Sequence, residues 1–207
     1  FKEYHKDEKL LIIRDGKRYD RGFGKALVDE CIAQNINFEK VAYSKLLSWS
    51  KHLGEGKTVV LHTGETRSSM TNAVVGLLKE AENVTLVGPS KWMDFSNIDY
   101  SQLERLKITF LSSNKAYVAN PESSTVYEAY KEAFKGFPSW YTYDGYDQMM
   151  FACESLDAFG EHFPLFLEGK SLSYANSNFT FKRTPSCFHN KSLHIFQLRE
   201  KELLLLD

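Results

Sequence analysis

Short apolar runs alternate with segments of helical periodicity along the first half of the chain. The runs have the length of buried strands, and several end at turns that contain Gly, Pro or polar residues. The segments between them repeat apolar residues every three or four positions, which is typical of helices. This alternation predicts right-handed crossovers and hence an α/β fold: a doubly wound, mainly parallel sheet with helices on both faces. The predicted strands are Leu10–Ile13, Val41–Tyr43, Thr58–Leu61, Val84–Val87 and Ile108–Leu111.

Helical periodicity fills the intervals between these strands and dominates after Pro121, with one break at Gly136–Pro138. Each predicted helix carries its apolar residues on one stripe, which we expect to face a core. The predicted helices are one with Phe23, Leu27, Val28, Cys31 and Ile32 that ends near Asn35, one at Ser44–Leu53, one that begins near Thr66, one with Val126, Tyr130, Ala133 and Phe134, and one at Gly145–Phe159 with Tyr146, Met149, Met150, Cys153 and Leu156.

The last part of the chain has a different character. Short β-like runs occur at Phe179–Phe181 and Leu193–Leu198, and Asn, Ser, Gly and Pro separate them. A small β-rich C-terminal tail is therefore expected to follow the helices and to pack on the same domain. The expected parts are an α/β lobe at residues 1–120, a helical segment at 121–160 and the β-rich tail at 161–207.

Composition excludes two classes of partner. The 207 residues are 43% hydrophobic, and 26% are charged with a net charge of −1, so no basic surface predicts nucleic-acid binding. No apolar stretch approaches the roughly 20 residues that cross a bilayer, so membrane insertion is not expected. The chain opens on Phe1 and soon enters its first predicted strand. A leader, or a whole preceding domain, is therefore expected to have been removed.

The residues that usually mark enzymes and metal sites lack the required spacing. The three cysteines form no CxxC pair, and the six histidines form no HxH or HxxxH pair, so no metal is expected. Cys31 and Cys153 fall on apolar helical faces, where a free Cys acts as a small hydrophobe. Gly22-Phe23-Gly24 lacks the third Gly of a dinucleotide fingerprint. Asp144 and Asp147 are interpreted as first-turn residues that complement a helix dipole. We expect no catalytic residue and no cofactor.

The turn Thr63-Gly64-Glu65-Thr66 is the best candidate for binding chemistry. Ligands of open parallel sheets bind outside the carboxyl ends of the strands, where this turn lies. Free N–H groups at the start of the following helix favour an anion such as a carboxylate. Alternatively, Glu65 and Thr66 only cap that helix. Gly64 allows either a close backbone approach or a left-handed turn.

Several segments together resemble a known family. Arg18–Gly22 follows the first strand, His62–Glu65 and Val87–Pro89 end later strands, and Tyr141–Asp147 opens a helix. This succession, between about Leu10 and Phe159, is similar to the second lobe and returning elements of type I periplasmic binding proteins. These are the branched-chain amino acid receptors of ABC importers. The resemblance implies two lobes that close on a ligand by a hinge, with the first lobe absent from this sequence.

The resemblance also implies site residues. Tyr19 corresponds to a loop aromatic that packs on the ligand, although it equally suits a cover for the helix start. Ser90 stands where amino-acid-specific relatives carry an acidic residue, and a hydroxyl cannot neutralise a buried ammonium. Trp92, Trp140 and Tyr143 are expected on exposed loops, as stacking platforms or as packing residues. The predicted ligand-binding residues are Tyr19, Thr63, Gly64, Glu65, Ser90 and Trp92.

The predicted function is non-catalytic recognition of a small polar solute, such as an amino acid or another small carboxylate. The resemblance implies a periplasmic or cell-envelope location and, as partners, the missing first lobe or a membrane permease. Two alternatives stay open: the effector-binding domain of a transcription regulator, and a degenerate interaction domain of the cell envelope. A flavodoxin-like enzyme is a more distant alternative.

Overall fold

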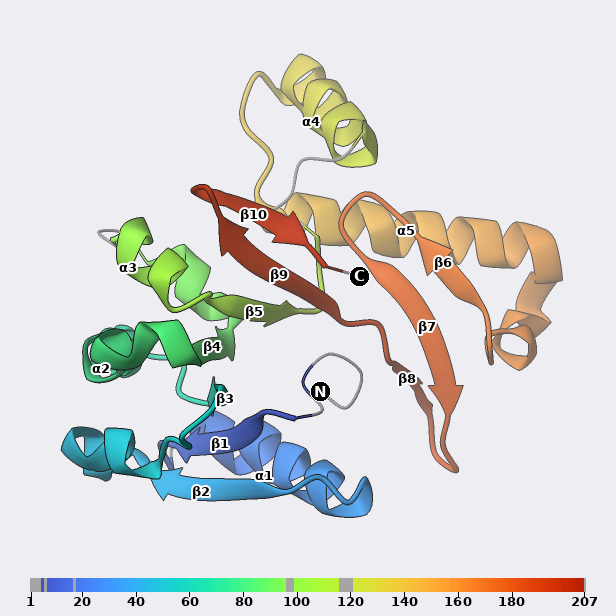
Figure 1. Ribbon diagram of the computed structural model, residues 1–207. Coiled ribbons are helices and arrows are strands. Elements are labelled where there is room, and N and C mark those ends of the chain that lie inside the picture. Colours follow the sequence, from blue (N-terminus) through green and yellow to red (C-terminus); the bar gives the residue numbers. More distant parts are fainter. Residues whose placement is uncertain (1–4, 6, 17, 96–98, 116–120, 207) are drawn as a thin grey trace. The chain divides into compact units, whose positions relative to one another are not determined.

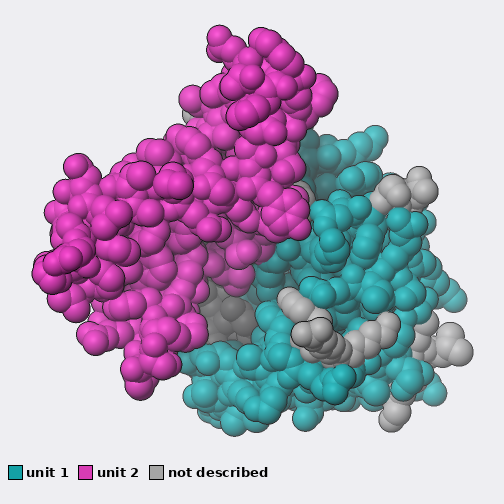
Figure 2. Space-filling view, turned by 180° about the vertical axis from the view of Figure 1, so that it is seen from behind, with its two compact units in different colours: residues 1–111, 195–206 teal, residues 112–194, 207 magenta. Residues whose placement is uncertain are grey.

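The computed structural model describes residues 5, 7–16, 18–95, 99–115 and 121–206. These residues fall into two compact units (Figure 2). Unit 1 comprises residues 1–111 and 195–206, and unit 2 comprises residues 112–194 together with residue 207. The chain thus leaves unit 1 after the fifth strand and returns to it for the last two. The three-part division at residues 120 and 160 stays a prediction.

Unit 1 is built on one seven-stranded sheet (Figure 1). The strand order is β10-β9-β5-β4-β3-β1-β2. β1 pairs in parallel with β2 and β3, and the parallel ladder continues from β3 through β4 to β5. β9 and β10 form an antiparallel pair, and β9 also runs opposite to its other neighbour, β5 (Figure 1). The strands are β1 (Lys9–Arg14), β2 (Phe38–Ala42), β3 (Thr58–His62), β4 (Val84–Pro89), β5 (Thr109–Ser112), β9 (His194–Arg199) and β10 (Glu202–Leu205).

Helices cover both faces of this sheet, as predicted. Successive strand residues point to opposite faces, and all four central residues of β1, Leu10–Ile13, are buried. On one face, Leu10 and Ile12 pack with Val28 and Cys31 of α1. The helical elements are α1 (Arg18–Ala33), α2 (Arg67–Leu77), α3 (Tyr100–Arg105) and the 3-10 segments η1 (Tyr43–His52), η2 (Leu78–Asn83) and η3 (Ser90–Asp94).

Three local predictions for unit 1 need comment. Asn35 has a φ of 52°, so it ends the first helical segment as predicted. Ile32, by contrast, is exposed, because it lies at the margin of the α1 stripe and not at its centre. The short helix α3 was not predicted, since its six residues are too few to show periodicity.

Unit 2 contains two long helices and a small antiparallel sheet. α4 spans Pro121–Phe134 and α5 spans Trp140–Phe159, followed by the 3-10 segment η4 (Gly160–Phe166). α5 begins five residues before the predicted Gly145, because Thr142 Oγ1 accepts a hydrogen bond from Ser139 N at 3.2 Å and caps the earlier start. The sheet order is β6-β7-β8, and its strands are β6 (Ser171–Ser173), β7 (Asn178–Arg183) and β8 (Phe188–Asn190).

The predicted apolar stripe of α5 is exposed, although it was expected to face a core. Cys153 was expected to be buried as a small hydrophobe, yet it is exposed, as are Met149 and Leu156 of the same stripe. The buried residues of α5 are instead Asp147 and Ser155. No described helix combines the length and the apolar character that crossing a bilayer requires.

Candidate functional site

The carboxyl ends of β1, β3 and β4, with the turns that follow them, form one edge of unit 1, here called the rim. These three strands are neighbours in the sheet and run parallel, so their last residues lie at the same edge. The pKa of Glu65, in the turn after β3, responds to Lys91 after β4 and to Asp15 after β1. The predicted convergence of these three turns is therefore confirmed.

Thr63 joins two strands of the rim. Its N–H and its Oγ1 both donate to the carbonyl of Ile13, at 3.1 and 3.2 Å, and its side chain is completely buried. These bonds close the end of β3 against β1. Thr63 therefore holds the rim together, and a direct contact with ligand stays a prediction.

Gly64 is a point of close packing. Its N–H donates to Nδ1 of His62 at 2.9 Å, and its carbonyl accepts from Nε1 of Trp92 at 2.8 Å. An added Cβ would lie 2.5 Å from Oγ of Ser69 and 2.8 Å from Cε1 of His62. Gly64 is not among the residues with positive φ, so the alternative of a left-handed turn is wrong. The close approach is real, but the approaching groups belong to the protein.

The start of α2 offers a charged and polar surface. Thr66 accepts a hydrogen bond from Ser69 N at 3.2 Å, which confirms the capping interpretation for Thr66. Glu65 is half-buried, and this burial raises the pKa of its carboxyl above the ordinary value. The charge of Lys91 lowers that pKa, and the charge of Asp15 raises it. The guanidinium of Arg67 lies 5.7 Å from the ring centre of Phe95. Lys91 is ion-paired with Asp94, with Nζ 3.0 Å from Oδ2. Two cations, the acids Asp15, Glu65 and Asp94, and a helix N-terminus thus lie on the rim.

An aromatic cluster packs around His62, the last residue of β3. The ring of His62 lies 5.7 Å from that of Tyr43, 5.8 Å from that of Trp49 and 5.5 Å from that of Trp92. Trp92 is completely buried, so the expectation of an exposed loop aromatic is wrong for this residue. A Cβ on Gly88 would lie 2.6 Å from the indole, which shows how tightly the turn after β4 packs.

The remaining predicted residues are placed less directly. The side chain of Tyr19 lies outside the described residues, and its backbone belongs to the first turn of α1 instead of a loop. Ser90 is half-exposed at the start of η3 on the rim. Trp140 and Tyr143 lie in the first turn of α5 in unit 2, so the expected loop position is wrong for both. Trp140 is exposed, whereas Tyr143 is half-buried and burial raises its pKa.

Sequence reasoning missed the role of His62 and misread that of Asp147. A polar residue at the end of an apolar strand was the available signal for His62. Asp147 is fully buried in the second turn of α5, and its carboxylate accepts from three consecutive backbone N–H groups, so the helix-dipole interpretation is wrong. The distances are 3.1 Å to Ala175 N, 2.8 Å to Asn176 N and 2.6 Å to Ser177 N.

Asp144 also binds this turn, since its Oδ1 accepts from Nδ2 of Asn176 at 2.7 Å. Tyr174 adds a third link, because its hydroxyl donates to Oε2 of Glu154 at 2.7 Å. The pKa of Tyr174 is raised by burial and by this bond to Glu154. The turn between β6 and β7 is therefore tied to α5 by three acidic side chains.

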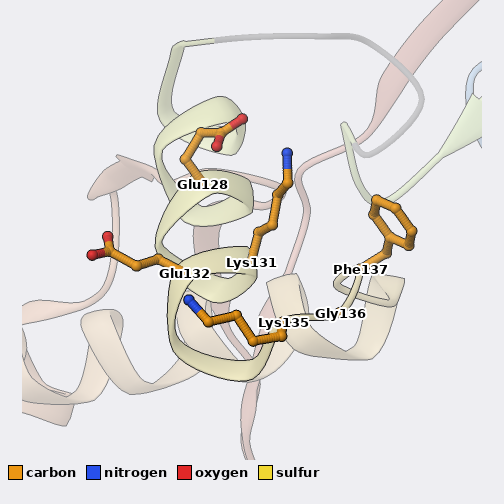
Figure 3. Close-up of a pocket in the computed structure, with 6 residues that line it drawn as sticks. All are labelled: Glu128, Lys131, Glu132, Lys135, Gly136 and Phe137. Carbon is orange, nitrogen blue, oxygen red and sulfur yellow. The ribbon is translucent and has the colours of Figure 1, made fainter.

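Unit 2 also carries a surface hollow of about 440 Å³ beside α4 (Figure 3). Its charged side chains are spaced along one helix and extend in different directions, so they do not converge on one point. It contains no residue predicted from the sequence to bind ligand. The lining residues are Glu128, Lys131, Glu132, Lys135, Gly136 and Phe137.

The sequence matches no family model and no curated protein. Several solved structures with the same fold are substrate-binding proteins of ABC transporters. An ABC transporter substrate-binding protein from Desulfitobacterium hafniense in complex with Leu has a TM-score of 0.61 at 13% identity, over 97% of this chain and 61% of that one. A putative branched-chain amino acid ABC transporter from Rhodospirillum rubrum has a TM-score of 0.62 at 9% identity, over 96% and 60%.

A third structure with this fold is the C-domain of LpoA from Haemophilus influenzae, described as a regulator of PBP1A. It has a TM-score of 0.58 at 10% identity, over 97% of this chain and 62% of that one. The chain thus has the fold of type I periplasmic binding proteins, which confirms the resemblance predicted from the sequence. It spans about three fifths of the length of these structures.

Proposed function

We propose that this chain is a non-catalytic recognition module that binds a small solute carrying a carboxylate at the rim of unit 1. The supporting observation is that the turns after β1, β3 and β4 meet at one edge and bring Lys91, Glu65 and the start of α2 together. The fold neighbours, which include proteins solved with Leu and with valine, support a small-molecule ligand and an extracytoplasmic location.

The chemistry of the rim favours a carboxylate. Ser69 N and Met70 N at the start of α2 donate to Thr66, and the positive end of the helix dipole attracts an anion to this edge. Arg67 and Lys91 add two cationic side chains at the same edge, and Lys91 also pairs with Asp94 at 3.0 Å. The hydroxyl of Ser90 cannot neutralise the ammonium of an amino acid, whereas the carboxylate of Glu65 can. An amino acid therefore requires Glu65, whereas a simple carboxylate does not.

A thermal-shift screen tests this function. Amino acids, carboxylates without an amine and sugars are added to the intact chain, because a ligand that binds only the folded state raises its melting temperature. We expect a carboxylate to raise the melting temperature and Lys91→Met to reduce that shift. Lys79→Met, at an exposed lysine beyond the other end of α2, is the matched control. A shift that survives Lys91→Met, or that only sugars produce, would contradict the proposal.

A second candidate is an interaction domain of the cell envelope that has lost its solute. The similarity to the LpoA C-domain supports it, since that protein is described as a regulator of another protein. This candidate is favoured if none of the screened solutes changes the melting temperature.

A further inference from the structure

Unit 1 carries a hollow of its own, here called the amino-edge hollow. It has a volume of about 510 Å³ and lies where α3 ends, next to the turn that joins β9 to β10 (Figure 1). β5 begins at this edge, whereas the rim lies at the carboxyl ends of β1, β3 and β4, which belong to the same parallel ladder. The two sites are therefore at opposite edges of the sheet. The polar lining residues of the hollow are Glu104, Arg105, Lys107, Gln197, Arg199 and Glu200.

Three cations of this hollow come from separate parts of the chain. Arg105 is the last residue of α3, Lys107 lies between α3 and β5, and Arg199 is the last residue of β9. All three are exposed. None of them forms an ion pair with a residue that the structure describes. Their charges are therefore available to a ligand.

Hydrogen bonds hold the guanidinium of Arg199 in place. Its Nε donates to Oε1 of Gln197 at 2.6 Å. Gln197 is fixed in turn, because its Nε2 donates to the carbonyl of Lys107 and to Oγ1 of Thr109, both at 3.4 Å. Within the described residues, Nε is the guanidinium nitrogen that has an acceptor, so the two terminal nitrogens are left as a fork for oxygen atoms of a ligand.

The two acids of the hollow leave these cations unpaired. Oε1 of Glu104 accepts from the backbone N–H of Lys201 at 2.9 Å, which attaches the turn between β9 and β10 to α3. Glu200 and Lys201 form this turn with φ values of 52° and 64°, where Asn and Gly are usual, so the surroundings must hold it. The lining has three cations and two acids, hence a net charge of +1, and the neighbouring Lys201 and Glu202 cancel each other.

A phosphate monoester matches this arrangement. At pH 7 its phosphoryl group carries a charge of about −1.5 to −2 and three strong acceptor oxygens, one for each cation, whereas a carboxylate offers two oxygens. An Arg fork binds phosphate through two parallel bonds, and Lys binds it as a point charge. The hollow also lies within the range of about 300–1,000 Å³ that is typical of small-molecule sites, so it has room for the organic part of the ester.

We propose that the amino-edge hollow binds the phosphate group of a phosphate monoester through Arg105, Lys107 and Arg199. The side chain of Glu200 is exposed beside them and can accept a hydrogen bond from a hydroxyl of the ester. The same group occurs in soluble phosphate esters and in the headgroup of phosphatidic acid. This site is independent of a solute at the rim.

Isothermal titration calorimetry of the intact chain with glycerol 3-phosphate tests the site. We expect Arg199→Met and Lys107→Met each to weaken binding roughly tenfold or more, as for the loss of one charge-assisted hydrogen bond. Arg183→Met is the matched control and should bind like the wild type, because Arg183 is also an exposed arginine at the last position of a strand, β7. Vesicles of phosphatidylcholine, with and without phosphatidic acid, present the same group on a membrane.

The outcomes separate the sources of the phosphate and the two sites. Binding of glycerol 3-phosphate supports a soluble ester, and binding only to the vesicles with phosphatidic acid supports a lipid. Failure of both probes to bind would overturn the proposal. So would an affinity that Arg183→Met lowers as much as Arg199→Met does, or one that Lys91→Met lowers, because the phosphate would then lie at the rim.

Lys107→Met keeps the test valid if Arg199→Met does not fold, which circular dichroism shows. The side chain of Lys107 makes no hydrogen bond or ion pair with a described residue, so its loss should leave the fold intact. An unchanged affinity in a folded Lys107→Met would also contradict the site. Solute binding at the rim is measured separately, by the melting-temperature shift with carboxylates, which Arg199→Met should leave unchanged.

Discussion

Replacing Asp147 by Ala should loosen the turn between β6 and β7 more than any change on the surface of α5. The carboxylate is the acceptor for the N–H groups of Ala175, Asn176 and Ser177. Ala175 and Asn176 are themselves buried, so water does not replace the lost acceptor without opening the turn. The substitution thus leaves at least two buried donors unsatisfied.

The expected cost follows from these bonds. A buried donor left without an acceptor costs about 1–3 kcal/mol. Burial raises the pKa of Asp147, and the N–H groups of Asn176, Ser177 and Ala175 lower it, so removing the charge also recovers some desolvation energy. We therefore expect a net loss of about 3 kcal/mol for Asp147→Ala. Asp147→Asn keeps one acceptor oxygen and should lose about 1 kcal/mol.

Hydrogen exchange is the suitable assay, because the two units need not unfold together and a single melting temperature would mix them. A loss of about 3 kcal/mol corresponds to roughly 100-fold faster exchange at the amides of residues 175–177. Asp157→Ala is the control, since Asp157 is an exposed aspartate on the same helix. Unchanged exchange in Asp147→Ala, or an equal increase in Asp157→Ala, would refute the structural role of this carboxylate.

Three further predictions concern the rim. Gly64→Ala should destabilise unit 1 by about 1–3 kcal/mol through the clash with the Ser69 hydroxyl, whereas Gly56→Ala, with open space around it, should be neutral in urea unfolding. Thr63→Val should cost about 1 kcal/mol in the same assay, because it loses one buried hydrogen bond; no loss would show that the backbone bond suffices. Burial raises the pKa of Glu65 in the folded protein above its ordinary 4.5. The wild type should therefore lose stability relative to Glu65→Gln as pH rises from 4.5 through the pKa of the folded state. A parallel pH dependence of the two melting temperatures would contradict this.

The central strands could be predicted because both faces of the sheet are covered. A strand buried on both sides is apolar at nearly every position, and all five residues of β3 (Thr58–His62) are buried, with Val59, Val60 and Leu61 at its centre. The prediction stopped at Leu61, one residue short, because the terminal His62 is polar. The start of α2 was predictable for a local reason, since the Thr66 cap acts within four residues of its own position.

The parts that could not be predicted depend on contacts distant in sequence. A helical stripe shows which residues share a face, but it does not show whether a partner covers that face. The apolar stripe of α5 is solvent-exposed, whereas the polar Asp147 is buried by donors that lie 28 to 30 residues later. Trp92 follows a Gly-Pro turn and looks like a loop residue, yet a bond to Gly64, 28 residues earlier, fixes it inside.

The same long-range contacts change which rim residues can select a ligand. Thr63, Gly64 and Trp92 use their polar groups within the protein, so they fix the shape of the rim. A fixed rim leaves discrimination to the half-buried and exposed groups, among which Glu65 and Lys91 carry opposite charges. Changing Glu65 should therefore alter the preference between amino acids and simple carboxylates. Changing Lys91 should weaken both classes, because both present a carboxylate to the same cationic edge.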